Sequence, residues 1–285
     1  MTIVRDASTT HPQSVHYSDG HGSGIARQIS VMLKRHLIRV RRKPETLLQL
    51  LLQPVAFVLF FTFVVGRSIS ADLVPRYREF LLPGIQAQAI VSTIVIVGAA
   101  ISFDLENCIF IRFRSLPISN YSPLIARGLI ALLYSMIGYV VIGLVGFLVG
   151  WRFSCSVADA ALALGLVLTF GLGFMWLGMA VGLLMKTVEG IGTITFLITL
   201  PVIALSNAFA PTQPMPHVLR VIAEWNPLSA ASQALRELTT HAPPAPPSAQ
   251  LPMHHPALFT LIYSVTFAVV LAPMAVRAYV RRTSQ

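Results

Sequence analysis

The chain has 285 residues, of which 55% are hydrophobic and only 11% are charged, and its formal net charge is +10. An ordinary soluble domain contains about 25% charged residues, and a soluble fold of this length could not cover so much apolar surface. The composition therefore excludes a soluble enzyme, a disordered protein and a disulfide-linked scaffold. Apolar runs interrupt the chain wherever a basic groove would need to lie, so the positive charge does not indicate a nucleic-acid partner.

The N-terminal part precedes the first long apolar run. Residues 1–23 are polar and lack the apolar core of a signal peptide, so we expect a disordered cytoplasmic tail. Residues 25–43 predict an amphipathic helix, because their apolar side chains fall mainly on one stripe and the basic ones lie outside it. Such a helix lies in the interface of the lipid bilayer. Its site residues are Arg35, Arg39 and Arg42, and Pro44 follows it.

Six apolar runs come next, each long enough to cross a bilayer, since a helical crossing takes about 20 residues. We place these spans near residues 47–66, 83–103, 124–149, 160–185, 190–210 and 257–277. The predicted fold class is therefore an all-α membrane protein with six transmembrane helices. Cytoplasmic N- and C-termini would put 15 of the 21 lysine and arginine residues inside, as the positive-inside rule favours.

The sequence offers few groups for chemistry of its own. It contains no GxxxxGK[ST], GxSxG, HExxH or CxxC motif, so no catalytic residue, nucleotide site, cofactor or metal site is predicted within the chain. The spans are also nearly free of Asp and Glu, which ion-coupled pumps use at depth. Any energy input is therefore expected from outside the chain.

The first internal loop, residues 104–117, is the most informative stretch. It starts with Asp104 and Glu106 and continues with Arg112 and Arg114 before Pro117. Acids at the start and cations near the end of a short helix both complement its dipole, and the proline stops it. This pattern predicts a short helix; a solvated loop that merely satisfies the positive-inside rule is the alternative.

Three blocks of sequence carry a family resemblance. Arg112-Phe113-Arg114-Ser115-Leu116-Pro117-Ile118-Ser119, preceded by Asp104-x-Glu106, resembles the cytoplasmic loop of ABC type-2 transporter permeases, in particular the daunorubicin-resistance type of drug exporter. The stretch from Leu200 to Arg236 is similar to the fifth span and outer segment of that family, and Arg42-Lys43-Pro44 to its basic entry helix. Residues 24–282 would then form one type-2 transmembrane domain.

The resemblance implies a mechanism and partners. A second permease subunit, identical or related, would complete the pathway, and a cytoplasmic ABC ATPase subunit would bind ATP-Mg. The loop helix would dock on that ATPase through Asp104, Glu106, Arg112, Phe113, Arg114, Ser115 and Pro117. The interfacial helix would flank the same site, and the protein would lie in the plasma (inner) membrane as a multi-pass protein.

Prolines dominate the segment at 211–256, which we expect on the outer side. Pro211 and Pro216 forbid a regular helix after the fifth span. A short surface helix is predicted from residue 217 to about Asn226-Pro227, and these four residues form a candidate outer gate. The alternative is an ordinary surface loop. The proline-rich residues 242–252 indicate a stiff external linker.

Polar amides within the spans are the remaining candidates for contact with a transported molecule. They are Gln49, Gln53, Gln86, Gln88 and Asn207. Amides in lipid face protein or a water-filled path, so helix packing and substrate contact remain equal alternatives for each. Glycines of the fourth span, from Gly165 to Gly182, suit close helix packing.

The favoured hypothesis is the permease subunit of an ATP-driven exporter of a hydrophobic or amphipathic molecule, such as a drug, an antibiotic or a lipid. One alternative is a membrane scaffold or sensor that assembles with an ATPase and moves nothing. Another is an ion-coupled carrier, which the scarcity of acids in the spans disfavours.

Overall fold

The computed structural model describes residue 34 and residues 44–65, 74–106, 122–152, 155–185, 188–240, 242–243 and 245–283. Among these residues every regular element is a helix, which confirms the all-α prediction for this part of the chain. The predicted tail, nearly all of the interfacial helix 25–43 and the loop residues 107–117 lie outside the described residues, and so do Arg35, Arg39, Arg42, Arg112, Phe113, Arg114, Ser115 and Pro117.

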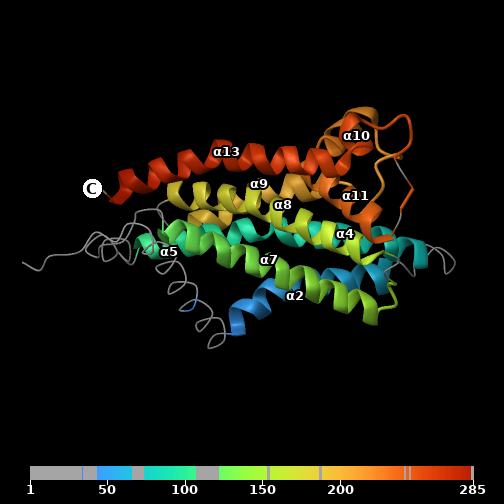
Figure 1. Cartoon of the computed structure of the whole chain (residues 1–285), viewed down its shortest axis with the longest axis horizontal. Helices are drawn as coiled ribbons and strands as arrows, with labels where there is room; N and C mark the ends of the chain where they lie inside the picture. Colours follow the sequence, from blue (N-terminus) through green and yellow to red (C-terminus); the bar gives the residue numbers. More distant parts are fainter. Residues whose placement is uncertain are drawn as a thin grey trace, which may run out of the picture.

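The long helices run side by side along the longest axis of the molecule (Figure 1). Their bounds are α2 Pro44–Phe60, continued by the π-helical turn η1 Phe61–Val65, α4 Val74–Val91, α5 Thr93–Glu106, α7 Ser122–Leu148, α8 Val157–Leu184, α9 Val188–Ala204 and α13 Pro256–Thr283. Shorter helices are α10 His217–Glu224, α11 Pro227–Thr240 and α12 Leu251–His254.

Four helical stretches within the described residues are long and apolar enough to cross a membrane: Tyr77–Asp104, Leu124–Leu148, Val157–Leu184 and Pro256–Arg281. They coincide with the second, third, fourth and sixth predicted spans. The first and fifth predicted spans fall on the shorter apolar helices Leu51–Val65 and Gly190–Ala204. The sidedness of the chain stays a prediction.

Several helix ends differ from the predicted boundaries for local reasons. The second span begins earlier, because α4 extends through polar residues that hydropathy alone does not assign to a span. The fifth ends six residues early, at Ala204 rather than residue 210. The fourth begins at Val157, because Ser156 and Asp159 form a capping box in which Ser156 Oγ accepts from the Asp159 backbone N–H.

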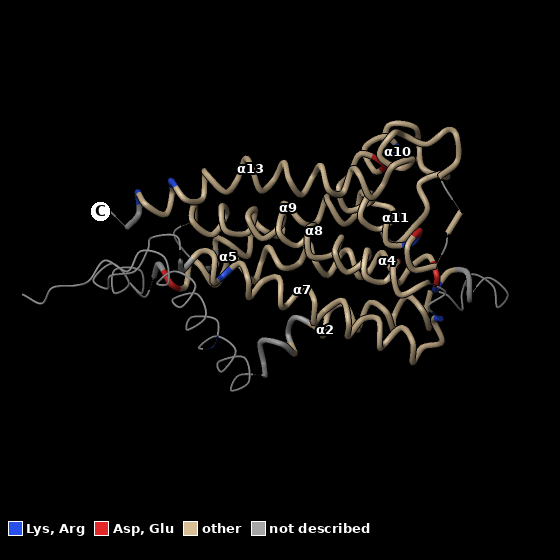
Figure 2. Tube along the Cα trace, in the orientation of Figure 1, with Lys and Arg blue, Asp and Glu red and all other residues tan. Residues whose placement is uncertain are grey.

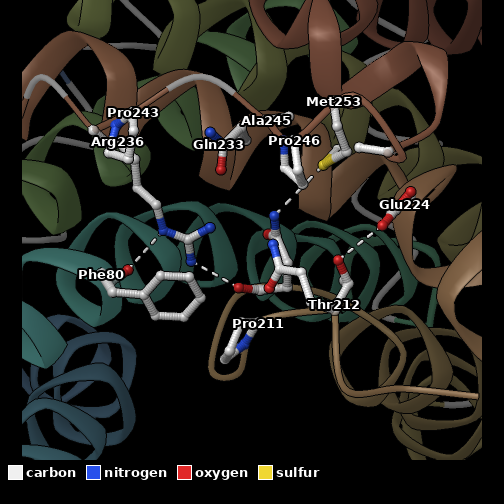
Figure 3. Close-up of a pocket in the computed structure, with 14 residues that line it drawn as sticks. Phe80, Pro211, Thr212, Glu224, Gln233, Arg236, Pro243, Ala245, Pro246 and Met253 are labelled. Carbon is white, nitrogen blue, oxygen red and sulfur yellow. Dashed lines mark hydrogen bonds between the residues drawn. The ribbon is translucent and has the colours of Figure 1, made fainter.

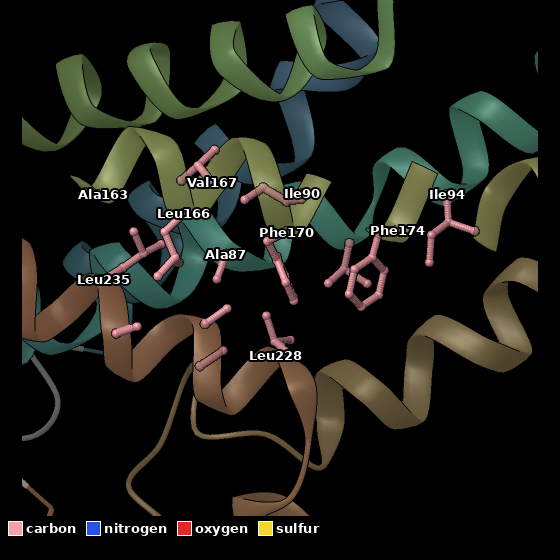
Figure 4. Close-up of a cluster of buried hydrophobic side chains, with 14 residues drawn as sticks. Ala87, Ile90, Ile94, Ala163, Leu166, Val167, Phe170, Phe174, Leu228 and Leu235 are labelled. Atoms are coloured by element: carbon pink, nitrogen blue, oxygen red, sulfur yellow. The ribbon is translucent and has the colours of Figure 1, made fainter. Parts of the chain in front are cut away.

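Helix α8 lies at the centre of the bundle and contacts α5, α7, α11 and α13. Figure 4 shows Phe170 and Phe174 of α8 among side chains of α4, α5 and α11. The predicted close packing holds at Gly178 and Gly182, where an added Cβ would lie 2.9 Å from the Ile94 carbonyl oxygen and 2.7 Å from the Gly98 carbonyl oxygen. Gly165 instead faces open space.

The described residues of the segment 205–255 fold against one end of the bundle (Figure 1); because this segment is predicted to lie on the outer side, we call it the outer cap. The predicted short helix is present as α10, but it ends at Glu224, and Pro227 starts a second helix, α11. The end of α10 agrees with the expectation of a helix ending near Asn226-Pro227, whereas the second helix was not expected, although proline is well suited to the first position of a helix. Helix α11 is buried between α4, α8 and α13 by an apolar stripe, Leu228, Ala231 and Leu235.

Charged residues of the described part gather at the two ends of the bundle, and its middle is almost free of them (Figure 2). A charge in the hydrocarbon core of a bilayer is costly. This distribution is therefore the one that a membrane-spanning bundle requires.

Candidate functional site

A cavity of about 760 Å³ lies between α2, α5 and α9. Its lining is mostly apolar, with three polar side chains: Gln53 of α2, Ser92 at the junction of α4 and α5, and Thr199 of α9. The apolar lining residues are Phe57, Val95, Ile96, Ala99, Ala100, Gly192, Phe196, Leu200 and Ile203. An apolar cavity with a few polar groups is the usual form of a site for a small amphipathic molecule.

Ser92 reaches the cavity because the second span is interrupted there. The Ser92 carbonyl accepts the Val95 N–H at 3.2 Å, three residues away rather than four. Thr93 Oγ1 donates to the Ile90 carbonyl at 2.7 Å, and Gln88 Nε2 donates to Ser92 Oγ at 3.2 Å. These side chains stabilise the irregular turn, which places the Ser92 hydroxyl about halfway along the span Tyr77–Asp104.

The predicted polar candidates separate into two groups. Gln53 is exposed and lines the cavity, whereas Gln86 and Gln88 are buried in helix packing, and Gln86 Nε2 donates weakly to the Tyr139 carbonyl at 3.4 Å. The side chain of Gln49 lies outside the described residues. Their contact with a transported molecule stays a prediction.

Sequence reasoning missed Ser92 and Thr199. Both hydroxyls sit in apolar runs where a single Ser or Thr is common, because it can donate to its own helix backbone, as Thr199 Oγ1 does to the Thr195 carbonyl at 2.7 Å. No pattern in the sequence separates Thr199 from Thr195, four residues earlier, which is buried and does not line the cavity.

At the outer cap a buried arginine binds three carbonyl groups. Arg236 of α11 donates from Nε to the Phe80 carbonyl at 2.7 Å, and from Nη2 to the carbonyls of Asn207 and Ala208 at 2.7 and 3.3 Å. Its guanidinium carbon lies 3.7 Å from the centroid of the Phe80 ring, a cation–π contact. No carboxylate of the described residues pairs with it. Burial lowers the pKa of Arg236 to about 9, so it remains charged at neutral pH.

Asn226, a predicted gate residue, joins two helix ends. Its Nδ2 donates to the carbonyls of Val202 and Leu205 at 2.7 and 2.6 Å, which satisfies the C-terminal end of α9. Its Oδ1 accepts the Leu228 N–H at 2.9 Å and so caps the start of α11. Asn226 therefore fixes the angle at which the chain leaves α9 and enters α11.

The other predicted cap residues have different positions. Asn207 is buried, and its backbone N–H donates to Ser229 Oγ at 2.9 Å. Pro211 is exposed at the rim of a second cavity, of about 430 Å³, which Arg236 and Glu224 also line (Figure 3). Pro216 directly precedes α10 and Pro227 begins α11. Their role as a gate stays a prediction.

At the opposite end of the bundle, Asp104 of α5 forms an ion pair with Arg127 of α7. These residues stand on either side of the loop predicted to contact an ATPase. Asp104 is 4% exposed, a position that suits anchoring of the loop ends. Glu106 ends α5, and its side chain lies outside the described residues. The ATPase contact stays a prediction for both.

Comparisons with known proteins give one family and several related permeases. Residues 27–239 match the family described as ABC-2 type transporter. The chain is 28% identical over 252 residues to a daunorubicin resistance ABC transporter permease protein of Streptomyces coeruleorubidus, covering 87% of this chain and 84% of that protein. It is 24% identical over 219 residues to a putative transport permease of Cyanophora paradoxa, covering 76% of this chain and 75% of that protein. For a putative transport permease of Bacillus subtilis (strain 168) the identity is 28% over 201 residues, covering 66% of this chain and 76% of that protein.

Proposed function

This chain belongs to the ABC-2 type transporter family, and from that premise we propose that it is the membrane permease subunit of an ATP-driven exporter. The family match makes it a transport permease subunit rather than a catalytic enzyme. ATP-Mg would bind to a separate cytoplasmic ATPase that docks on the loop after α5. The protein would act in the plasma membrane.

The observation that carries this proposal is the cavity of about 760 Å³ between α2, α5 and α9. Its apolar walls suit the body of a hydrophobic or amphipathic cargo, and Gln53, Ser92 and Thr199 offer a few hydrogen bonds to orient it. The drug-resistance relative favours a drug-like cargo over a lipid.

A second permease subunit, identical or related, would close the cavity. Helix α9, which forms one wall, exposes Phe196, Leu197 and Leu200 beside it. Large exposed apolar side chains next to a pathway are suited to cover by another helix rather than to contact with cargo alone.

The test uses vesicles that contain the permease and its ATPase, with daunorubicin as the transported probe. Gln53→Leu and Thr199→Val each remove one hydrogen-bonding group worth about 1 kcal/mol, so the apparent KM for daunorubicin should rise about 5-fold. Thr195→Val is the matched control, because Thr195 lies on the same helix, is buried and does not line the cavity.

Equal KM values for all three variants would contradict the assignment of the cavity. An intact complex without any ATP-dependent movement of daunorubicin or other amphipathic probes would favour the scaffold or sensor alternative. Flux driven by a proton gradient without the ATPase would favour an ion-coupled carrier.

A further inference from the structure

Helix α10 of the outer cap has one buried and one exposed face. Ala223 and Glu224 point inward and are buried. Val218 is 69% exposed, Ile222 48% and the following Trp225 46%. The spacing of these three residues, four and then three positions, places them on one side of a helix, so α10 presents a continuous apolar strip away from the protein.

The inner face fixes the direction in which this strip points. Glu224 Oε1 accepts from Thr212 Oγ1 at 2.9 Å, and Glu224 Oε2 accepts the Gln250 N–H at 2.7 Å. One carboxylate thereby connects α10 to the loop before it and to the start of α12. Figure 3 shows Glu224 directed toward Thr212 beside the smaller cavity. Rotation of α10 to hide its apolar strip would break both hydrogen bonds.

The strip adjoins the membrane-spanning helix α13. Trp225 packs edge-on against Phe259, with ring centroids 6.0 Å apart, and Tyr263 Oη donates to the Trp225 carbonyl at 2.8 Å. The exposed face of α13 is also apolar; it includes Leu258, Ile262, Val265 and Val269. Because α13 is long and apolar enough to cross a bilayer, that face is suited to contact with lipid, and α10 lies at the end of α13 (Figure 1).

Two further features match the boundary between head groups and acyl chains. Tryptophan and tyrosine concentrate there, because their rings are apolar and one edge forms hydrogen bonds. His217, which is exposed, begins the helix and can donate a hydrogen bond to a phosphate group. Three large exposed apolar residues on one side of a helix form a patch that marks a surface of interaction rather than one in contact with water alone.

We propose that α10 lies in the interfacial layer of the bilayer, with Val218, Ile222 and Trp225 inserted among the upper acyl chains and phospholipid as the partner of this face. The cap is thereby held by lipid on its outer side and by Glu224 on its inner side. Movement of the cap away from the bundle would have to withdraw α10 from the membrane.

Depth-dependent quenching of Trp225 fluorescence tests this. The chain has three tryptophans, so Trp151→Phe with Trp176→Phe leaves Trp225 alone in the full-length protein. It is reconstituted in phosphatidylcholine vesicles, with or without acyl chains brominated near the head group. We expect the brominated lipid to remove most of the Trp225 emission and aqueous iodide to remove little. A protein that retains only Trp151, which is 1% exposed, should be quenched weakly by both.

Strong quenching by iodide and none by brominated lipid would place α10 in water and overturn the proposal. Weak quenching by both would show that protein, such as a second copy of the chain, covers the strip, and would overturn the choice of lipid. Ile222→Asp should make Trp225 more accessible to iodide.

If the double Trp variant does not reconstitute, a nitroxide on Val218→Cys in a background without Cys108 and Cys155 gives the same comparison through collisions with oxygen and with a soluble nickel complex. Neither readout involves an ATPase or a cargo. A negative result would therefore contradict the membrane position of α10 without contradicting the proposed transport function.

Discussion

Arg236 Nη2 donates a hydrogen bond of 2.7 Å to the carbonyl of Asn207, 29 residues earlier in the chain. The same guanidinium donates to the Phe80 carbonyl, so one side chain connects α11, the loop after α9 and the first part of α4. A buried charge is costly unless its hydrogen bonds are satisfied. The position of the outer cap on the bundle therefore depends strongly on this arginine.

Replacement of Arg236 by leucine should lower the free energy of unfolding by about 2–3 kcal/mol, because charge-assisted hydrogen bonds are lost and carbonyls remain unpaired. Lysine should rescue this only in part, since it cannot reproduce the planar fork of donors. The measurement is SDS-induced unfolding in mixed micelles. Arg220→Leu on α10 is the control; a loss of the same size there would contradict a specific role for Arg236.

Gly84 of α4 is expected to tolerate no larger residue. A Cβ at this position would overlap the carbonyl oxygen of Ala208 in the outer cap, and that atom belongs to the backbone segment that Arg236 also holds. Gly84→Ala should therefore cost about 1–3 kcal/mol. Gly165→Ala in α8 meets no atom within 4 Å and should be neutral or stabilise by up to about 1 kcal/mol. Thermal midpoints in detergent that rank the two variants in the opposite order would refute this packing.

Asn226→Asp separates the two roles of this side chain. Aspartate keeps the acceptor that caps α11 at Leu228, but it loses the donors to Val202 and Leu205 and brings negative charge toward their carbonyls. We expect a destabilisation of about 2 kcal/mol, although Asp and Asn are equivalent at an ordinary N-cap. Ser156→Asn, at the N-cap of α8, should be nearly neutral in the same unfolding assay. An equally neutral Asn226→Asp would mean that its link to α9 is unimportant.

The ion pair of Asp104 and Arg127 should behave as one unit. Arg127→Gln removes the ion-pair partner of a buried carboxylate and should cost about 3–5 kcal/mol, whereas Asp104→Asn leaves the partly buried Arg127 and should cost less. The double variant should cost clearly less than the sum of the two, which a double-mutant cycle on unfolding free energies measures. If Asp104→Asn retained full stability but lost binding of the ATPase, Asp104 would be a direct contact rather than an anchor for the loop.

Hydropathy located the apolar helices well but not their ends. The predicted third and sixth spans begin within two residues of the first residues of α7 and α13, because the sequence just before each helix is polar. The second and fifth spans were misjudged at one end each, because α4 continues through polar residues and α9 stops inside an apolar run. Asn226 ends α9 by binding its last carbonyls, and no local pattern before Ala204 reports this.

The amide side chains also show what the sequence can and cannot predict. Gln53 and Gln88 look alike in the sequence, each an amide in an apolar run, yet Gln53 lines the cavity and Gln88 is buried between helices. Which face of a helix meets a cavity depends on how its neighbours pack. The sequence alone could therefore nominate these residues but could not separate them.

By itself the sequence determined the membrane environment, the all-helical class, the positions of most apolar helices and the family, because each follows from composition, the local run of side chains or motifs in a fixed order. The tertiary structure alone decided that α11 is buried, that Arg236 and Asn226 hold the cap, that Ser92 and Thr199 face a cavity and that α10 turns an apolar strip outward. These properties depend on residues brought together from distant parts of the chain. Their energies come from hydrogen bonds and packing between helices, which no window along the sequence contains.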